Sequence, residues 1–465
     1  MFNFLSMVDH TYLQTEGDTN LSTERKAWAE GITDGNTISA LQRDAQSFMH
    51  QALSSPCLDV IETSEGVYIQ NLKGKPYIDF HGNNVHQLGY NNRYIIDRVK
   101  AQLDTLAFCP RRFTNLPAIE LAERLVSLTN HTLTRVLFAP GGTSAIGIAL
   151  KIARFYTGKY KTIGIYDSFH GASMDSIALG GEYVFQQGLG PLLSGSVHIP
   201  PVDAYRGMWY NNDAAYGDMA YADYLEYVIQ KEGDVGVLVV ETIRSTVVHV
   251  HSSQYWKRVR EICDKYDVLL VLDEIPIGMG RTGRMFAYEH TDIEPDILVL
   301  GKGLGAGIMP MAAVVCKEKL NVASSISLGH FTHEKSPLGA AAALAAFDFM
   351  EERDVLGHVD TMGTYLQDRL LALKDKYEII GDVRGIGLLW AIELVQDRKT
   401  KEKDTTAAER VMYRCLEDGL SLKVSDGATL SLYPPLIISK QELDKALMIL
   451  ESGLAVVMRD NVSTR

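Results

Sequence analysis

Short apolar runs alternate with amphipathic segments through the middle of the chain. Apolar runs of this length fit buried strands, and apolar residues three or four positions apart fit helices. Alternation of the two predicts an α/β fold, with a mostly parallel sheet covered by helices on both faces. The predicted strands are 135–139, 162–166, 235–240, 268–272, 297–300 and 311–316, and the predicted helices are 94–106, 118–128, 144–156 and 255–266.

The two ends of the chain have a different pattern. Residues 1–50 are polar with helical fragments, and the segment 63–79 alternates around Gly74-Lys75-Pro76, which predicts short antiparallel strands. Beyond residue 340, two long helices, a strand at 388–394 and a last helix predict a smaller α+β unit. We therefore expect an N-terminal arm (1–50), a small domain formed by both termini (51–90 and 346–465), and a large domain (91–345).

Composition narrows the functional classes. The chain has 465 residues, 46% of them hydrophobic, so more than one domain is expected. A formal charge of −13 and a pI near 5.5 argue against nucleic acid or an anionic membrane as a general partner. Without a signal-like N-terminus or an apolar stretch of membrane length, the expectation is a cytoplasmic protein. The five cysteines are scattered without metal spacing, so neither a zinc site nor a disulfide framework is expected.

Two predicted strands end in groups that can carry chemistry. The run 268–272 ends in Asp273-Glu274, and the run 297–300 ends in Lys302 between two glycines. Carboxyl ends of parallel strands meet at one sheet edge, which is where ligands bind in such folds. Glycines beside Lys302 would leave space for a bulky group to approach the backbone. Most lysines are solvated surface groups, but an amine in this position also suits a Schiff base.

Other strand ends complete the pattern. Gly141-Gly142-Thr143 lies where a strand turns into a helix, which favours a phosphate, although a Gly-Gly pair can be a plain turn. Phe169 could stack on a flat ring or be a core aromatic. A buried Asp273 needs a cationic partner, such as a protonated pyridine nitrogen, unless it caps a helix or accepts hydrogen bonds at the sheet end. Together these residues predict a pyridoxal 5′-phosphate (PLP) site.

The same residues lie in motifs that resemble the class III (ω-amino acid type) aminotransferase family of fold-type I PLP enzymes, over roughly residues 55–455. The motifs include FAPGGTSAIGIALKIAR, SFHGAS, VLDEIPIGMGRTGR and LGKGLGAGIMPMAA. The resemblance implies a seven-stranded-type sheet and a homodimer with shared active sites. It also implies that Lys302 is catalytic and binds the cofactor as a Schiff base, Asp273 binds the ring nitrogen, Phe169 stacks on the ring, Gly142 and Thr143 hold the phosphate, and Thr332 reaches the phosphate of the neighbouring subunit.

Departures from the family pattern lie on the substrate side. Pro276 stands where the family usually has a glutamine near the cofactor's phenolic oxygen, and Ser431 where many members place an arginine for a substrate carboxylate. The variant motifs HGNNVHQLGY, CPRRFTN and GHFTHEKSP resemble a narrower group of ammonia-lyases in the family, which act on a small hydroxylated aminophosphonate. The resemblance implies an ammonia-lyase that yields phosphonoacetaldehyde. The alternatives are an ω-aminotransferase with an unusual amine donor and a silent PLP-binding module, which intact Lys302 and Asp273 disfavour.

A phosphonate needs cationic or donor groups. Guanidinium groups bind such anions well, although most arginines lie on solvated surfaces. Histidines are candidates for an acid or a phosphonate ligand because of their pKa. The candidate substrate residues are Arg111, Arg112, Glu241, Arg244 and His81, with His86 as a further histidine.

Overall fold

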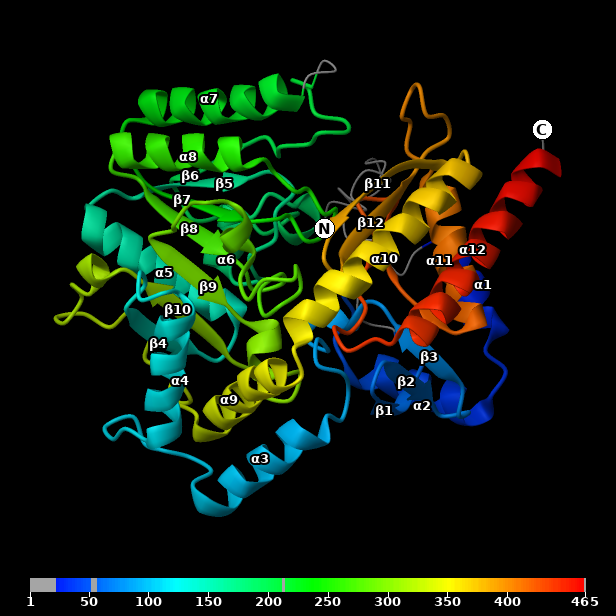
Figure 1. The fold of residues 1–465 in the computed structure, drawn as a ribbon, viewed down its shortest axis with the longest axis horizontal. Coiled ribbons are helices and arrows are strands. Elements are labelled where there is room, and N and C mark those ends of the chain that lie inside the picture. Colours follow the sequence, from blue (N-terminus) through cyan, green and yellow to red (C-terminus); the bar gives the residue numbers. More distant parts are fainter. Residues whose placement is uncertain (1–21, 52–56, 211–213, 464–465) are drawn as a thin grey trace, which may run out of the picture.

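A seven-stranded sheet forms the centre of the computed structural model, which describes residues 22–51, 57–210 and 214–463 (Figure 1). Apolar runs buried on both faces form this sheet, as expected for a sheet covered by helices. Strand β10 is antiparallel to both of its neighbours and the remaining pairs are parallel, so the predicted mostly parallel sheet is confirmed. The strand order is β4 (Arg135–Ala139), β10 (Ala312–Cys316), β9 (Ile297–Leu300), β8 (Leu269–Asp273), β7 (Val235–Glu241), β5 (Lys161–Ile165) and β6 (Ser196–Ile199).

Helices cover this sheet and begin at side-chain caps. Ser252 caps α8 (Ser253–Lys265), whose buried face includes Trp256 and Ile262. Ser336 caps α9 (Pro337–Glu352), with proline at its first position, where no backbone donor is needed. Figure 1 shows α7 and α8 stacked on one side, with α3, α4 and α9 at the opposite end. The remaining large-domain helices are α3 (Arg93–Thr105), α4 (Leu116–Leu128), α5 (Gly142–Thr157), α6 (Met174–Leu179) and α7 (Ala214–Glu232).

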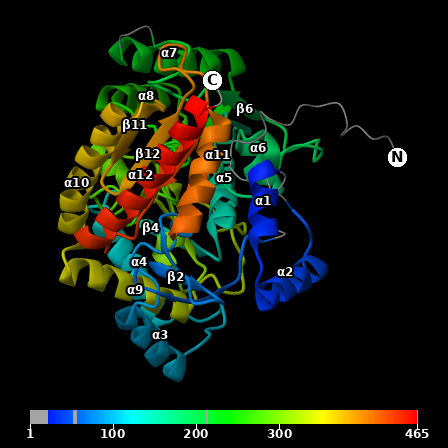
Figure 2. The ribbon, with the colours of Figure 1, turned by 90° about the vertical axis from the view of Figure 1, so that its right-hand side faces the viewer.

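The two ends of the chain share a sheet in the smaller part of the molecule. Strands β1 (Ile61–Glu65), β2 (Tyr68–Asn71) and β3 (Pro76–Asp79) form the predicted antiparallel strands, and β13 (Leu420–Ser421) joins β3 in parallel. A second sheet has the order β11 (Ile380–Ile386), β12 (Leu389–Leu394), β15 (Thr429–Leu432), β14 (Lys423–Ser425). The helices here are α1 (Thr23–Gly31), α2 (Gly35–Ser47), α10 (Val355–Lys376), α11 (Thr405–Asp418) and α12 (Lys440–Ser463), of which α10, α11 and α12 lie side by side (Figures 1 and 2).

The sequence pattern missed some elements. It assigned no element to 381–387, where the structure has β11 in antiparallel pairing with β12. Gly381 and Gly385 interrupt the side-chain pattern that would have predicted this strand. Packing requires both glycines, because a Cβ on Gly385 would clash with the Trp390 ring and one on Gly381 with the Tyr205 hydroxyl. No element was assigned between 172 and 234, which holds α6, β6 and α7. The predicted boundary at residue 345 falls inside the continuous helix α9 and stays a prediction.

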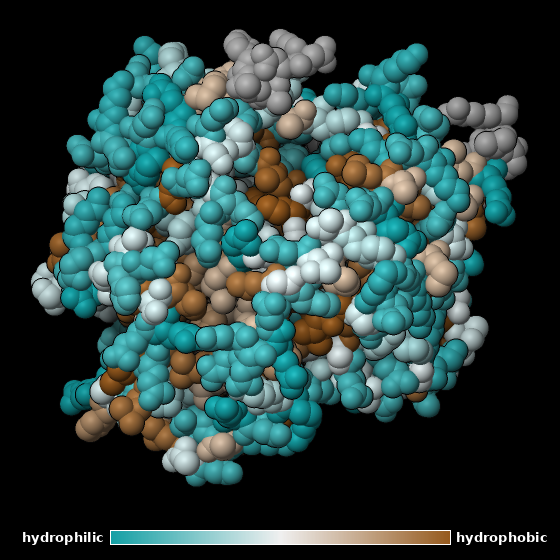
Figure 3. Space-filling model, viewed as in Figure 1, coloured by the Kyte–Doolittle hydropathy of each residue, from teal (hydrophilic) through white to brown (hydrophobic). Residues whose placement is uncertain are grey.

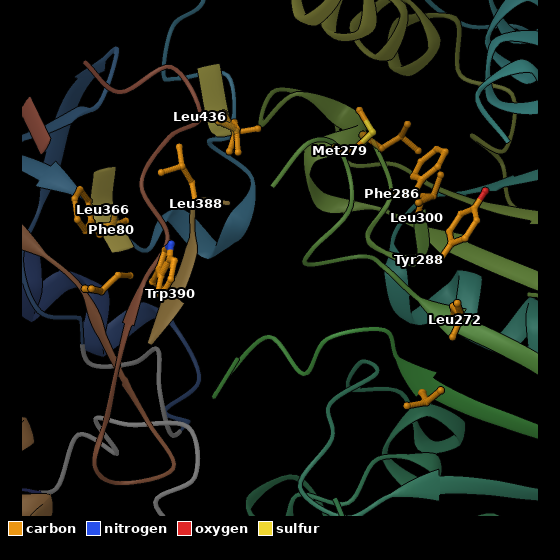
Figure 4. Close-up of a cluster of buried hydrophobic side chains, with 14 of the residues drawn as sticks. Phe80, Leu272, Met279, Phe286, Tyr288, Leu300, Leu366, Leu388, Trp390 and Leu436 are labelled. Atoms are coloured by element: carbon orange, nitrogen blue, oxygen red, sulfur yellow. The ribbon is translucent and has the colours of Figure 1, made fainter. Parts of the chain in front are cut away.

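Buried apolar side chains of both parts meet in one core cluster. Figure 4 shows Leu388, Trp390 and Leu436 on one side, facing Met279 and Phe286 on the other. Packing of this kind fixes the two parts relative to each other, which matters because the cavity described next lies between them. No helix of the described residues is both long and apolar enough to cross a membrane.

Candidate active site

A cavity of about 620 Å³ opens where the carboxyl end of the large sheet faces the smaller part of the molecule. Two walls can be distinguished by the part of the chain that supplies them. The large-domain wall is formed by residues that include Gly142, Thr143, Phe169, His170, Asp273 and Lys302. The small-domain wall is formed by residues that include His81, Asn83, Asn84, Lys423, Ser425 and Tyr433.

The turn from β4 into α5 forms an anion cradle on the large-domain wall. Gly141 is the N-cap of α5 and has no side chain that could accept hydrogen bonds from the first amides of the helix. A Cβ on Gly142 would lie 2.7 Å from Ile275 Cδ1, which explains the glycine. Thr143 Oγ1 lies 2.7 Å from Ser173 Oγ and 3.0 Å from Ser176 Oγ, which holds its hydroxyl at the cradle. Such a helix start suits a phosphate.

Asp273 is the last residue of β8 and is only 1% exposed. Its Oδ2 accepts a hydrogen bond from His170 Nδ1 at 2.7 Å, and its Oδ1 accepts one from the Ile275 amide at 3.0 Å. Burial disfavours the imidazolium, but the hydrogen bond and charge of Asp273, with the charge of Glu241, raise the pKa of His170. His170 therefore helps to keep a carboxylate at this buried position.

The sequence did not assign His170 a role, although it stands beside Phe169 in the quoted motif. Its Nε2 is buried at the cavity wall without a hydrogen-bond partner among the described residues. Phe169 lines the cavity as well, with its ring 4.5 Å from that of Phe185 at 39°. An aromatic face and a charged acceptor therefore lie on the same wall.

Lys302 follows β9 and adopts a left-handed backbone with φ 45°, which is uncommon for a residue with a side chain. Strained positions of this kind cluster at functional sites. The neighbouring glycines lie close to protein side chains. A Cβ on Gly303 would clash with the Gln87 amide, and one on Gly301 would lie 3.2 Å from Ile275 Cγ2. Packing against Gln87 thus accounts for Gly303, and the space for a bulky group beside Lys302 stays a prediction.

Of the predicted substrate residues, His81 lines the cavity. Burial and the nearby charges of Lys423 and Lys302 lower its pKa to about 4, against the opposing effect of Asp79. The imidazole is therefore neutral near pH 7. His86 does not line the cavity, and its Nε2 contacts the Asp79 carbonyl oxygen at 3.0 Å. Asn84, which the sequence did not single out, has a buried Oδ1 without a partner in the described part of the chain.

Glu241 and Arg244 do not line this cavity, in contrast to the predicted direct contact with substrate. Both are buried behind the large-domain wall, around a pocket of only about 20 Å³ that also contains His249. Glu241 pairs in register with Asp273 on the adjacent strand and accepts a hydrogen bond from the Ser245 amide at 2.8 Å. Burial, together with the charge of Asp273, raises the pKa of Glu241. Glu241 therefore contacts the site indirectly, through Asp273 and through Ser245, which lines the cavity.

The predicted residues Arg111, Arg112 and Thr332 lie outside the cavity of their own chain. The segments that carry them are in contact, because the Phe108 and His333 rings are 5.3 Å apart and Asn115 Nδ2 donates to the Lys335 carbonyl at 3.0 Å. Arg112 and Thr332 are exposed and Arg111 is half-buried. Their roles toward a cofactor phosphate or substrate stay predictions that require a second subunit.

Known proteins similar to this chain include an ammonia-lyase and a racemase. The (R)-1-hydroxy-2-aminoethylphosphonate ammonia-lyase of Vibrio splendidus (strain 12B01) is 50% identical over 463 residues, which cover 97% of each chain. The leucine/methionine racemase of Thermococcus litoralis is 33% identical and is matched over 85% of this chain and 90% of its own length.

Solved structures similar to this chain include two transaminases. An amine transaminase from an uncultivated Pseudomonas species, described as the PLP-bound (internal aldimine) form, has a TM-score of 0.84 and 29% identity, covering 88% of this chain and 99% of its own. An omega-transaminase from Thermomicrobium roseum has a TM-score of 0.85 and 26% identity, covering 92% and 100%. The family model "Aminotransferase class-III" matches residues 50–454. The chain therefore belongs to the class-III aminotransferase family.

Proposed function

We propose that this chain is a PLP-dependent ammonia-lyase that converts (R)-1-hydroxy-2-aminoethylphosphonate to phosphonoacetaldehyde and ammonia. The observation that carries the proposal is the 50% identity to the Vibrio splendidus ammonia-lyase over 97% of both chains. The family pattern alone would favour a transaminase. Two features support the lyase instead: Pro276 lines the cavity where the family has glutamine, and position 431 holds a buried serine in place of a carboxylate-binding arginine.

The large-domain wall fits PLP. The uncapped start of α5 at Gly142 offers amides for the phosphate, and the glycine leaves room that a Cβ would fill. Asp273 offers a buried carboxylate that suits a protonated ring nitrogen, and Phe169 would lie against the ring. Lys302 would hold the cofactor covalently through Nζ. These residues therefore provide the donor set that this cofactor needs.

The proposed reaction removes water from the substrate and then adds it back. When bound, PLP withdraws electrons from the carbon that carries the substrate's amine. Lys302 Nζ would take a proton from that carbon, and hydroxide would leave the neighbouring carbon, which bears the phosphorus, with a proton supplied by an acid of the site. Hydrolysis of the resulting enamine gives ammonia and the aldehyde. Asp273, held by His170, would keep its negative charge throughout.

A single incubation tests this function. The purified holoenzyme is given (R)-1-hydroxy-2-aminoethylphosphonate without any keto acid, and ammonia and aldehyde are measured. We expect both products in equal amounts and far beyond one equivalent per subunit. Turnover that requires pyruvate or 2-oxoglutarate would identify a transaminase and contradict the proposal.

We further propose that the chain acts as a homodimer in which Thr332 of one subunit reaches the cofactor phosphate of the other. An exposed apolar segment, 103–116, supports it: Phe113 is 67% and Leu116 71% exposed. Figure 3 shows apolar side chains over the loop between α3 and α4 at the lower left. This segment touches the segment of Thr332 through Phe108 and His333. Exposed apolar surface of this kind marks interfaces.

Light scattering tests the dimer. The double variant Phe113→Glu/Leu116→Glu should shift the protein toward a monomer, because charges would be buried in the contact. The same variant should retain less cofactor on dialysis, because Thr332 of one subunit would no longer reach the cofactor phosphate of the other. Met448→Glu, at a 61% exposed apolar residue of α12, is the matched control and should remain dimeric. A monomeric wild type, or a dimeric double variant, would contradict this assembly.

A further inference from the structure

Lys423 lies on the small-domain wall, opposite the groups that fit the cofactor. It is the first residue of β14, and both Lys423 and Ser425 line the cavity. Residues two apart in a strand point to the same face, so this edge of β14 presents an ammonium group and a hydroxyl to the cavity. The sequence did not single out either residue, because a lysine in a short polar strand carries no motif.

The strand register relates Lys423 to the position of the family's arginine. Lys423 pairs directly with Ser431 on β15. Side chains of directly opposed residues leave the same face of a sheet, with Cβ atoms about 5 Å apart. Ser431 is fully buried, and its hydroxyl donates to the Thr246 carbonyl oxygen at 3.0 Å. The positive charge that many relatives carry on this strand is therefore found one strand away.

Lysine side chains provide the positive charge at the cavity. Among the described residues that line the cavity there is no arginine, and Lys302 and Lys423 are the two lysines. His81 lies within the influence of both ammonium groups, which help to lower its pKa to about 4 after the larger effect of burial. His81 is thus neutral near pH 7. Lys423 and Lys302 therefore both place a positive charge at the cavity, within electrostatic reach of His81.

We propose that Lys423 binds the phosphonate group of the substrate. This inference rests on the proposed function, since it identifies the group that recognises the anionic end of that substrate. A lysine can do this because its ammonium is a compact point charge that binds phosphate-like oxygens. In the substrate, the phosphonate is separated from the amine by two carbons, which agrees with a cation close to Lys302. Ser425 Oγ, 3.2 Å from Ser431 Oγ, offers a neighbouring hydroxyl.

Binding of two ligands without turnover tests the proposal. Titration calorimetry on the holoenzyme uses 2-aminoethylphosphonate, which lacks the leaving hydroxyl, and ethylamine, which lacks both this hydroxyl and the phosphonate. Lys423→Met should weaken binding of the aminophosphonate about 10- to 100-fold, the usual effect of losing a charge-assisted contact. Its affinity for ethylamine should stay within about twofold of wild type. Lys423→Arg should recover most of the phosphonate affinity.

The kinetic readout should separate binding from chemistry. With the hydroxylated substrate, Lys423→Met should raise KM more than it lowers kcat, because the lost contact is already made in the ground state. Lys376→Met removes the same charge from an exposed lysine that pairs with Glu451, and should change neither ligand's affinity. If Lys423→Met does not fold, as judged by circular dichroism and the visible cofactor absorption, Lys423→Gln is the second neutral variant.

Each outcome bears on one of the two proposals. Unchanged affinity of the neutral variants for 2-aminoethylphosphonate would overturn the role of Lys423, even if the wild type releases ammonia. A wild type that binds the aminophosphonate through Lys423 but releases no ammonia would overturn the lyase and leave Lys423 as the phosphonate ligand. A wild type that binds no aminophosphonate would overturn both.

Discussion

The two walls of the cavity are built in different ways. On the large-domain wall, Asp273 ends a strand that is buried on both faces, and His170 and a backbone amide hold both of its oxygens. On the small-domain wall, His81 precedes a short 3₁₀ turn and Lys423 begins a three-residue strand. One wall is part of the main sheet, whereas the other consists of short segments that meet only when the two ends of the chain come together.

This difference bears on the departure at Ser431, whereas the other departure, Pro276, lines the cavity just after β8. A change at Asp273 would leave His170 and a buried amide without their acceptor, which is costly. The small-domain wall can exchange an arginine at position 431 for a lysine one strand away, because the same face is reached from either strand. The cofactor can thus be retained while substrate recognition changes. The following variants test whether the walls are separable in this way.

The largest effect should come from Lys302→Ala. If Lys302 holds the cofactor and moves the proton, ammonia release should fall by at least about 10²–10⁴-fold. The visible absorption of the bound cofactor should also change, and 2-aminoethylphosphonate should still bind through Lys423. Activity close to that of wild type would show that Lys302 is misassigned. Loss of aminophosphonate binding along with activity would show that the two walls do not act separately.

Asp273→Asn should give the next largest effect. Replacing the carboxylate removes the negative charge proposed for the cofactor ring, and we expect kcat to fall about 10²-fold, as when a preorganised charge-stabilising group is lost. The kinetics should be measured beside cofactor retention on dialysis. The adjacent carboxyl Glu274, which does not line the cavity, provides the control through Glu274→Gln. Equal losses of kcat in both variants would indicate a general structural effect instead.

Glu274→Gln should mainly change the pH dependence of stability. Burial raises the pKa of Glu274 to about 7, although Thr242 and the amides of Ala287 and Tyr288 donate hydrogen bonds to it. Between the ordinary pKa of 4.5 and this value, the folded state holds a proton that the unfolded state has lost, so stability from this group decreases as pH rises.

The advantage of wild type over the glutamine variant should therefore shrink by about 2–3 kcal/mol from pH 5 to pH 8. Urea unfolding at each pH measures the difference. A gap that stays constant, or widens with pH, would show that Glu274 is already ionised at pH 5. Of the effects discussed, this is the smallest, since it leaves the cavity unchanged.

The sequence predicted the large-domain wall better than the small-domain wall for a physical reason. Strands such as β4 and β9 are continuous apolar runs, and the residues that follow them must lie at one edge of a parallel sheet. Asp273, Phe169 and Lys302 could be placed by this rule alone. Lys423 could not be placed by this rule. Strand β14 has three residues and its partner β15 has four, so neither forms a long apolar run in the sequence. Glu241 and Arg244 also lie at the end of a strand, yet both are buried around the separate small pocket and not at the cavity.

By itself the sequence determined the α/β class, six of the seven strands of the large sheet and the set of groups that suits PLP, because these follow from local periodicity and from strand ends. Only the tertiary structure decided which groups face which. The register of β14 on β15 places Lys423 opposite Ser431, and the packing of the small part on the large part brings both lysines to one cavity. The two lysines are more than a hundred positions apart in the chain, and their meeting depends on how side chains pack rather than on any local pattern.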